Sequence, residues 1–262
     1  MPLKLVIGPA NAEKARVALD DYRRALAAGR EPILVVPTFA DVEVYRRELA
    51  STGAVFGVQV MRMGWLLREI AQRAKVAGTP LGALARERVA AVAARGSELA
   101  SARTPGFAPA LVNLFAELGE LRLDPPRVIQ ALRAWTEDDP GRRAYADELG
   151  SMYAAYRREL ERVEALDEQG RDAAALDALR LDPESWGSSP VVIYGFDDLT
   201  PLQRDAVETL AVHAGADVTL TLTYERGRAA LAARAGVFED LRALPGAEVV
   251  ELQAVAEHYE EA

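Results

Sequence analysis

The chain has 262 residues, of which 50% are hydrophobic and 27% charged, which is the composition of a globular protein and excludes disordered and fibrous classes. Its formal charge of −9 argues against a uniformly basic nucleic-acid binder, although not against a local basic face. The absence of cysteine excludes disulfides, zinc ribbons, iron–sulfur clusters and thiol nucleophiles. No apolar run is long enough to span a membrane and the amino terminus lacks a signal-peptide core, so we expect a cytoplasmic protein without membrane contact.

The first part of the chain alternates the patterns of strands and helices. Apolar runs predict strands at 3–7, 33–36 and 55–61, and the continuous run at 33–36 is typical of a strand covered on both faces. Helical spacing predicts three helices beside these strands: residues 12–28, residues 41–49 with Asp41 as N-cap, and a stripe of Leu66, Leu67, Ile70 and Ala74.

The middle of the chain contains no convincing strand pattern between about 81 and 179. Apolar residues instead recur at helical spacing in two stripes: Leu111, Leu114, Phe115, Leu118 and Leu121, then Leu149, Tyr153, Tyr156, Leu160 and Val163. Pro125-Pro126 and the segment 138–141 mark breaks between helices. This part is predicted to be an all-helical block.

Strand patterns return after this block. The run 191–194 predicts a buried strand, the alternation at 218–224 predicts a half-exposed or edge strand, and 249–252 predicts a last short strand. The fold class is therefore predicted to be α/β, with a parallel sheet formed by 1–80 and 180–262 and interrupted by a helical insertion at 81–179.

The segment 8–15 lies where a phosphate-binding loop would follow the first strand. Gly8 and Lys14 match that motif, whereas Glu13 replaces its second glycine and Ala15 replaces the hydroxyl residue that normally binds Mg²⁺. An ordinary strand-to-helix turn explains the segment equally well. Weak nucleotide binding through Gly8, Lys14 and the helix amino terminus stays open, without hydrolysis.

The segment 191–203 carries a more specific signal. It resembles the second nucleotide-binding motif of UvrD-like helicases, and more closely the Gly-Phe-x-x-Leu/Phe-Thr-Pro-Leu-Gln variant of AddB-type subunits of helicase–nucleases. The matching residues are Phe196, Asp198, Pro201, Leu202 and Gln203. The resemblance implies that the Mg²⁺-binding aspartate and the water-polarising glutamate of active helicases correspond to Tyr194 and Gly195. We therefore assign no catalytic residue and no metal ligand, and expect no ATP hydrolysis.

Two further segments resemble helicase motifs that contact single-stranded DNA. By position in those motifs, the resemblance implies DNA contacts by Thr38, Phe39, Arg62 and Trp65. It also implies a P-loop-NTPase-like 1A domain carrying a 1B-like insertion. In the family a second motor domain and a nuclease domain follow, so we expect this chain to be a fragment or a truncated relative.

Simpler interpretations remain for several residues. Asp197 and Asp198 fit capping or solvation better than metal binding, and core packing is the default for Trp65, Trp135 and Trp186. The spaced Asp and Glu-x-Lys pattern of a nuclease is not evident. The leading hypothesis is a catalytically degenerate, helicase-like module of a DNA end-processing helicase–nuclease, acting beside an active partner subunit on single-stranded DNA. The alternatives are an active ATP-dependent helicase domain and a protein-interaction module that binds neither DNA nor ATP.

Overall fold

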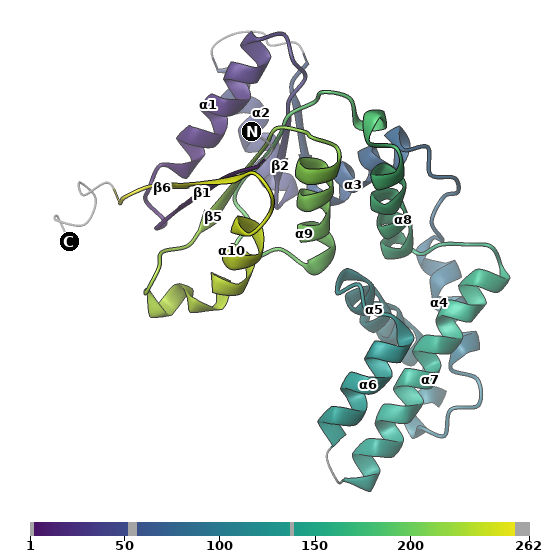
Figure 1. Cartoon of the computed structure of the whole chain (residues 1–262). Helices are drawn as coiled ribbons and strands as arrows, with labels where there is room; N and C mark the ends of the chain where they lie inside the picture. The colour runs from purple at the N-terminus through teal and green to yellow at the C-terminus, as the bar shows by residue number, and fades with distance from the viewer. Residues whose placement is uncertain (1–2, 52–56, 137–138, 255–262) are drawn as a thin grey trace. The chain divides into compact units, whose positions relative to one another are not determined.

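The computed structural model describes residues 3–51, 57–136 and 139–254. The chain divides into two compact units, Met1–Lys75 with Ala175–Ala262, and Val76–Ala174. The first unit contains the sheet and the second is built from helices (Figure 1). Their assignment to a 1A-like domain and a 1B-like insertion stays a prediction.

The first unit is an α/β structure around one parallel sheet. Its strands are β1 (Leu3–Gly8), β2 (Ile33–Val36), β3 (Gln59–Arg62), β4 (Val191–Ile193), β5 (Val218–Thr223) and β6 (Ala247–Glu251). They lie in the order β3-β2-β4-β5-β1-β6, and every neighbouring pair is parallel. The carboxyl ends of all these strands therefore open on one edge of the sheet, where parallel α/β proteins place their ligands.

Helices cover both faces of this sheet (Figure 1). They are α1 (Lys14–Ala27), α2 (Phe39–Ala50), α3 (Met63–Arg73), α9 (Pro201–Glu208) and α10 (Ala235–Arg242). The side chains of Tyr22 on α1 and Val42 on α2 pack with Leu34 of β2 in one apolar core. Because all four residues of β2 are fully buried, this strand is covered on both faces, as its continuous apolar run predicts.

The position of β5 differs from the prediction of a half-exposed or edge strand. β5 lies between β4 and β1, and both Thr219 and Thr221 are buried. The hydroxyl of Thr219 donates to Oδ2 of Asp21 on α1 at 3.1 Å. A threonine can be buried at low cost when its hydroxyl finds such a partner. The alternation of apolar residues and threonines therefore does not indicate a solvent-exposed face here.

Two predicted boundaries also shift. The N-cap of α2 is Thr38 rather than Asp41, because the Thr38 hydroxyl accepts from the Asp41 amide while the Asp41 carboxylate accepts from the Thr38 amide. Asp41 is thus the third helical residue of a capping box. The third strand begins at Gln59, and the part of its predicted range at 55–56 lies outside the described residues.

The second unit contains only helices in its described residues, 76–136 and 139–174. They are α4 (Ala83–Ala93), α5 (Phe107–Glu120), α6 (Pro125–Thr136) and α7 (Pro140–Arg162), with a short 3-10 helix (Ala100–Arg103) between α4 and α5, and α8 (Glu168–Leu181) continues into the first unit. Phe115 packs against Tyr153 and Tyr156, with ring centroids 5.2 and 4.8 Å apart. Leu121 and Val163, the last members of the two predicted stripes, are exposed because each lies just after its helix ends. Within the described ranges, no helix is both long and apolar enough to cross a bilayer.

Candidate functional site

A cavity of about 200 Å³ lies where the loops after β1 and β4 meet the end of β5. Lys14, the first residue of α1, lines the same cavity as Tyr194 and Gly195 of the loop after β4 and Thr221 and Thr223 of β5. The two sequence motifs, which are separated by about 180 positions along the chain, are therefore brought to one site. Sequence reasoning identified the first three residues and missed the threonines.

The side chain of Lys14 is folded back onto its own loop. Its ammonium donates to the carbonyl oxygen of Gly8 at 3.1 Å and to that of Pro9, and only 6% of the residue is exposed. Burial, and then the nearby Arg234 guanidinium, lower the pKa of Lys14 from 10.5 to about 8. Lys14 therefore closes the loop, as a structural link, while keeping a positive charge at neutral pH.

Glu13 and Gly8 adopt backbone conformations that suit this closed loop. Glu13 lies in the left-handed region with φ of 51°, and its carboxylate turns to Nε of Arg16 at 2.7 Å. Gly8 has φ of 154°, and a Cβ there would lie 2.7 Å from the carbonyl oxygen of Leu252 and 2.9 Å from Cβ of Ala12. The close approach of Leu252 requires glycine at position 8 for steric reasons alone.

Tyr194 and Gly195 offer no ligands for a divalent cation. The ring of Tyr194 packs edge-on against the ring of Tyr45, with centroids 5.4 Å apart. Gly195 has φ of 85°, and a Cβ there would lie 3.3 Å from Cδ of Pro37. Magnesium prefers carboxylate, phosphate and water oxygens, and the described part of the chain contains no cluster of three or more acidic, histidine or cysteine side chains arranged for a metal. A magnesium ion does not fit this donor set.

The remainder of the second motif has clear structural roles. Asp198 accepts a hydrogen bond from the Leu199 amide at 2.8 Å, and Asp197 forms an ion pair with Arg234 at 2.9 Å. Thr200 is the N-cap of α9 and forms a capping box with Gln203, while Pro201 occupies the first helical turn. The matching Thr-Pro-Leu-Gln segment thus encodes a helix start beside the cavity.

The four residues predicted to contact DNA lie at the carboxyl ends of two neighbouring strands. Thr38 and Phe39 begin α2 directly after β2, and Arg62 ends β3 one helical turn before Trp65. The register of the sheet pairs Val36 with Arg62, so the two segments leave the sheet side by side. The hydroxyl of Thr38 already forms the helix cap, which leaves Phe39, Arg62 and Trp65 with free side-chain surface.

Phe39 and Trp65 are unusual in being exposed aromatic residues. Phe39 is 57% and Trp65 38% exposed, and the Arg62 guanidinium lies 5.9 Å from the centroid of the Trp65 ring. Trp186 differs, because it is 1% exposed and its indole nitrogen donates to the carbonyl of Ser189. Base stacking is therefore excluded for Trp186 in this fold, whereas Trp135 is exposed in the second unit.

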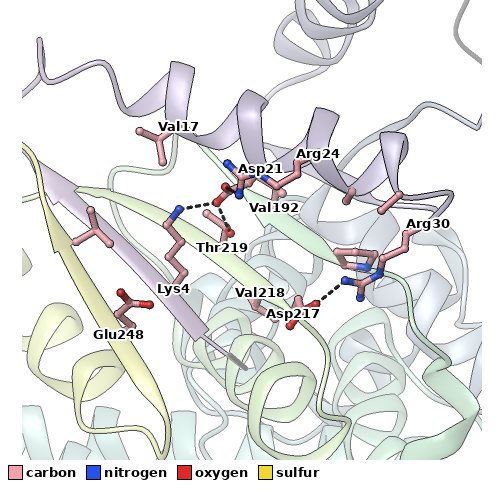
Figure 2. A pocket seen from close by; sticks show the side chains of 14 residues that line it. Lys4, Val17, Asp21, Arg24, Arg30, Val192, Asp217, Val218, Thr219 and Glu248 are labelled. Carbon is pink, nitrogen blue, oxygen red and sulfur yellow. Dashed lines mark hydrogen bonds and ion pairs between the residues drawn. The ribbon is translucent and has the colours of Figure 1, made fainter.

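A larger hollow of about 700 Å³ lies between α1 and the amino-terminal parts of strands β1, β4, β5 and β6 (Figure 2). Its charged groups are largely neutralised by one another: the Lys4 ammonium binds Asp21 at 2.9 Å, and Arg30 binds Asp217 (Figure 2). The hydrogen bond from Arg30 holds the pKa of Asp217 below its ordinary value. This network joins α1 to the sheet and lies away from the predicted motifs.

No protein-family model matches the chain. The chain is similar to the B subunit of the ATP-dependent helicase/deoxyribonuclease of Moorella thermoacetica, with 30% identity over 241 residues. The chain is a distant homologue of that protein. The match covers 85% of this chain but 20% of the relative, so the chain spans about a fifth of the length of the protein it matches. This relationship supports the AddB-like resemblance that the segment 191–203 indicates, and the helicase–nuclease role is that of the relative.

Proposed function

We propose that the chain is a helicase-like module that contacts single-stranded DNA, as part of an AddB-like subunit, without hydrolysing ATP itself. The proposal rests on Tyr194 and Gly195, which follow the carboxyl end of β4. By the resemblance, an active motor requires two carboxylates at these positions. Electrostatic stabilisation by the metal and phosphate loop supplies most of the catalysis in nucleotide hydrolysis. Lys14, which is held by its own loop, adds to this argument.

The DNA contact is supported by the exposed side chains at the ends of β2 and β3. Phe39 and Trp65 present aromatic surface, and the exposed Arg62 adds a positive charge beside the indole ring. Aromatic rings next to an arginine form a common platform for unpaired bases, because every base has a stacking face. The amino termini of α2 and α3, which carry partial positive charge from the helix dipoles, also lie at the carboxyl ends of β2 and β3. We also propose a partner subunit, because the name of the relative describes one subunit of a helicase/deoxyribonuclease.

The DNA contact is tested by fluorescence anisotropy with a labelled single-stranded oligonucleotide at two salt concentrations. We expect binding that weakens as salt rises, because phosphate contacts release counterions. Phe39→Ala and Trp65→Ala should each weaken binding about tenfold, which is within the range of roughly 1–3 kcal/mol for one stacked base. Trp135→Ala is the matched control, since it removes an exposed indole from the other unit.

Two results would contradict the proposal. Absence of salt-dependent binding at low salt, with or without a partner subunit, would favour a protein-interaction module instead. Turnover of ATP by the purified chain with Mg²⁺ and oligonucleotide, lost on Lys14→Ala, would favour an active motor. Each result overturns a different half of the proposal, because one concerns DNA and the other hydrolysis.

A further inference from the structure

We infer that the outer edge of β6 is a docking site for an extended segment of a partner protein, which adds to the sheet as a further strand and carries the pattern basic–apolar–apolar–basic. β6 is the last strand in the order β3-β2-β4-β5-β1-β6, and within the described residues it pairs with β1 alone (Figure 1). Addition of a strand to a sheet edge is a recurring way in which proteins bind extended segments. The inference is independent of the proposed DNA contact, which lies at β2 and β3 toward the other edge of the sheet.

The backbone of β6 offers hydrogen-bonding groups along this edge. The Leu252 amide, just after the strand, donates to the carbonyl oxygen of Ile7 at 2.8 Å. In a parallel pair, alternate residues of a strand bond to the same neighbour, so Glu248 and Val250 also bond toward β1. Val249 and Glu251 therefore direct their amides and carbonyls outward, where no other strand of the described sheet lies. These outward groups are the template that an added strand requires.

The other edge strand, β3, differs in that side chains bind its backbone. The Gln59 amide donates to the hydroxyl of Tyr22 on α1 at 2.9 Å, and Arg46 on α2 donates to the carbonyl oxygen of Val60 at 3.3 Å. In the part of the chain that the structure describes, no side chain forms such a hydrogen bond with the backbone of β6. β6 is thus the edge that is open to a further strand.

The side chains of β6 state the chemistry of its partner. Glu248 and Glu251 are exposed and form no ion pair with any described residue. Lys4 lies beside Glu248 in the register of the sheet, but its ammonium binds Asp21 at 2.9 Å instead (Figure 2). Because opposite charges on directly paired residues stabilise a sheet, the two glutamates favour a strand with a basic residue opposite each of them.

Two half-buried valines lie between these glutamates, one on each face of the strand. Val250 shares the α1 face with Glu248 and lines the hollow of about 700 Å³, whose wall also includes Val17. Val249 and Glu251 face the opposite side, because side chains alternate along a strand. Apolar residues opposite the two valines would therefore cover apolar surface on both faces. The pattern basic–apolar–apolar–basic reads the same in both directions, so it fits a parallel or an antiparallel strand.

Charge and sequence favour a different protein over a second copy of this chain. Two copies that met along β6 would place the glutamates of both edges in one seam, and like charges opposite one another are destabilising. No two lysine or arginine residues of the 262 are three positions apart, so these residues contain no segment with the matching pattern. The net charge of −9 also favours a basic partner.

The test is fluorescence anisotropy of the full chain with a labelled peptide of sequence Thr-Arg-Val-Val-Arg-Thr. We expect saturable binding of this peptide, and no binding of Thr-Glu-Val-Val-Glu-Thr. The variant Glu248→Lys with Glu251→Lys should weaken binding of the basic peptide about tenfold and should gain binding of the acidic one, because both cross-strand pairs change sign. Glu31→Lys with Glu184→Lys is the matched control, since it changes the net charge equally at two exposed acids outside β6.

Two methylated peptides separate strand addition from simple attraction between charges. One carries N-methyl groups on the first arginine and the second valine, and the other carries them on the first valine and the second arginine. An added strand turns only alternate amides to β6, so one methylated peptide should lose binding while the other keeps it. Equal affinity of the two, absence of binding by the basic peptide, or a dimer of the chain that dissociates in Glu248→Lys with Glu251→Lys would each overturn the inference. Thermal unfolding shows whether both double variants are folded.

Discussion

The ring of Tyr194 packs edge-on against the ring of Tyr45, with centroids 5.4 Å apart. This contact joins the end of β4 to α2, and both rings border the apolar core that Tyr22, Leu34 and Val42 form. Burial, and then the hydrogen bond with Tyr194, raise the pKa of Tyr45. Tyr194, which the resemblance to helicases aligns with a metal-binding aspartate, therefore stabilises the fold through an aromatic contact.

Introducing an acidic pair at positions 194 and 195 should not create a motor. In Tyr194→Asp with Gly195→Glu, a carboxylate would replace the ring that packs on Tyr45, and a glutamate would take the left-handed backbone of Gly195 at a cost of about 1–3 kcal/mol. We expect a lower midpoint of urea unfolding and no ATP turnover with Mg²⁺. The control Tyr194→Phe keeps the ring contact and loses only the hydrogen bond to Tyr45, so its midpoint should fall less than that of the double variant. A stable double variant that hydrolyses ATP would show that the two side chains alone had been missing.

The titration of Lys14 should appear in the pH dependence of stability. The pKa of Lys14 is lowered from 10.5 to about 8 in the folded chain, so the unfolded chain binds more protons between these values. The free energy of unfolding should therefore rise with pH across this interval. The charged groups around Lys14 are Arg234 and Glu13, with Asp197 bound to Arg234.

Urea unfolding at pH 7.5, 8.5 and 9.5 measures this contribution. Lys14→Met should reduce the rise in unfolding free energy relative to the wild type, because its side chain has no proton to lose. Lys75→Met, at an exposed lysine, is the matched control and should follow the wild-type curve. Parallel curves for the wild type and Lys14→Met would contradict the burial of a charged ammonium in the loop.

The Thr200 capping box should contribute to stability rather than to ligand binding. Thr200→Ala removes the side chain that accepts from the Gln203 amide, at an expected cost of about 1 kcal/mol in the free energy of unfolding. Thr200→Ser keeps the hydroxyl and should retain most of that stability. A loss of oligonucleotide binding by folded Thr200→Ala would indicate a direct contact instead of a helix cap.

The three tryptophans should separate into one core residue and two surface residues. Trp186→Ala should lower the free energy of unfolding by about 3–5 kcal/mol, because it removes a buried indole on which Arg73 stacks. Trp65→Ala and Trp135→Ala remove exposed rings and should cost much less. Chemical denaturation of the three variants ranks them, and equal losses would place Trp65 in the core.

The sequence predicts the sheet well where local chemistry decides the structure. Continuous apolar runs such as 33–36 and 191–193 are buried strands in the structure, since nothing but a two-sided core accommodates them. The alternation at 218–223 misleads, because the partner that allows Thr219 to be buried is Asp21, almost 200 positions away. A polar residue on a strand face therefore does not by itself indicate exposure to solvent.

The candidate site could be predicted in part. Gly8, Lys14, Tyr194 and Gly195 stand out because each occupies a position with known chemistry in related motifs, and the structure brings Lys14 to Tyr194 and Gly195 at one cavity. Thr221 and Arg234 could not be found in this way, since their relevance depends on which strand is central and which loop returns to it. The sequence hints at Thr221 only through the alternation of threonines in this strand. That alternation is typical of a half-exposed or edge strand, whereas β5 lies inside the sheet.

The close approach of Leu252 to Gly8 bears on how nucleotide-binding loops are recognised in sequences. Any side chain at position 8 would collide with the backbone carbonyl of Leu252, so a mutational scan should find this glycine intolerant whether or not any phosphate ever binds. Selection for packing would then preserve the appearance of a nucleotide loop long after its chemistry had gone. A sequence search that takes this glycine as evidence of ATP binding in an ancestor would misinterpret a residue that packing alone requires.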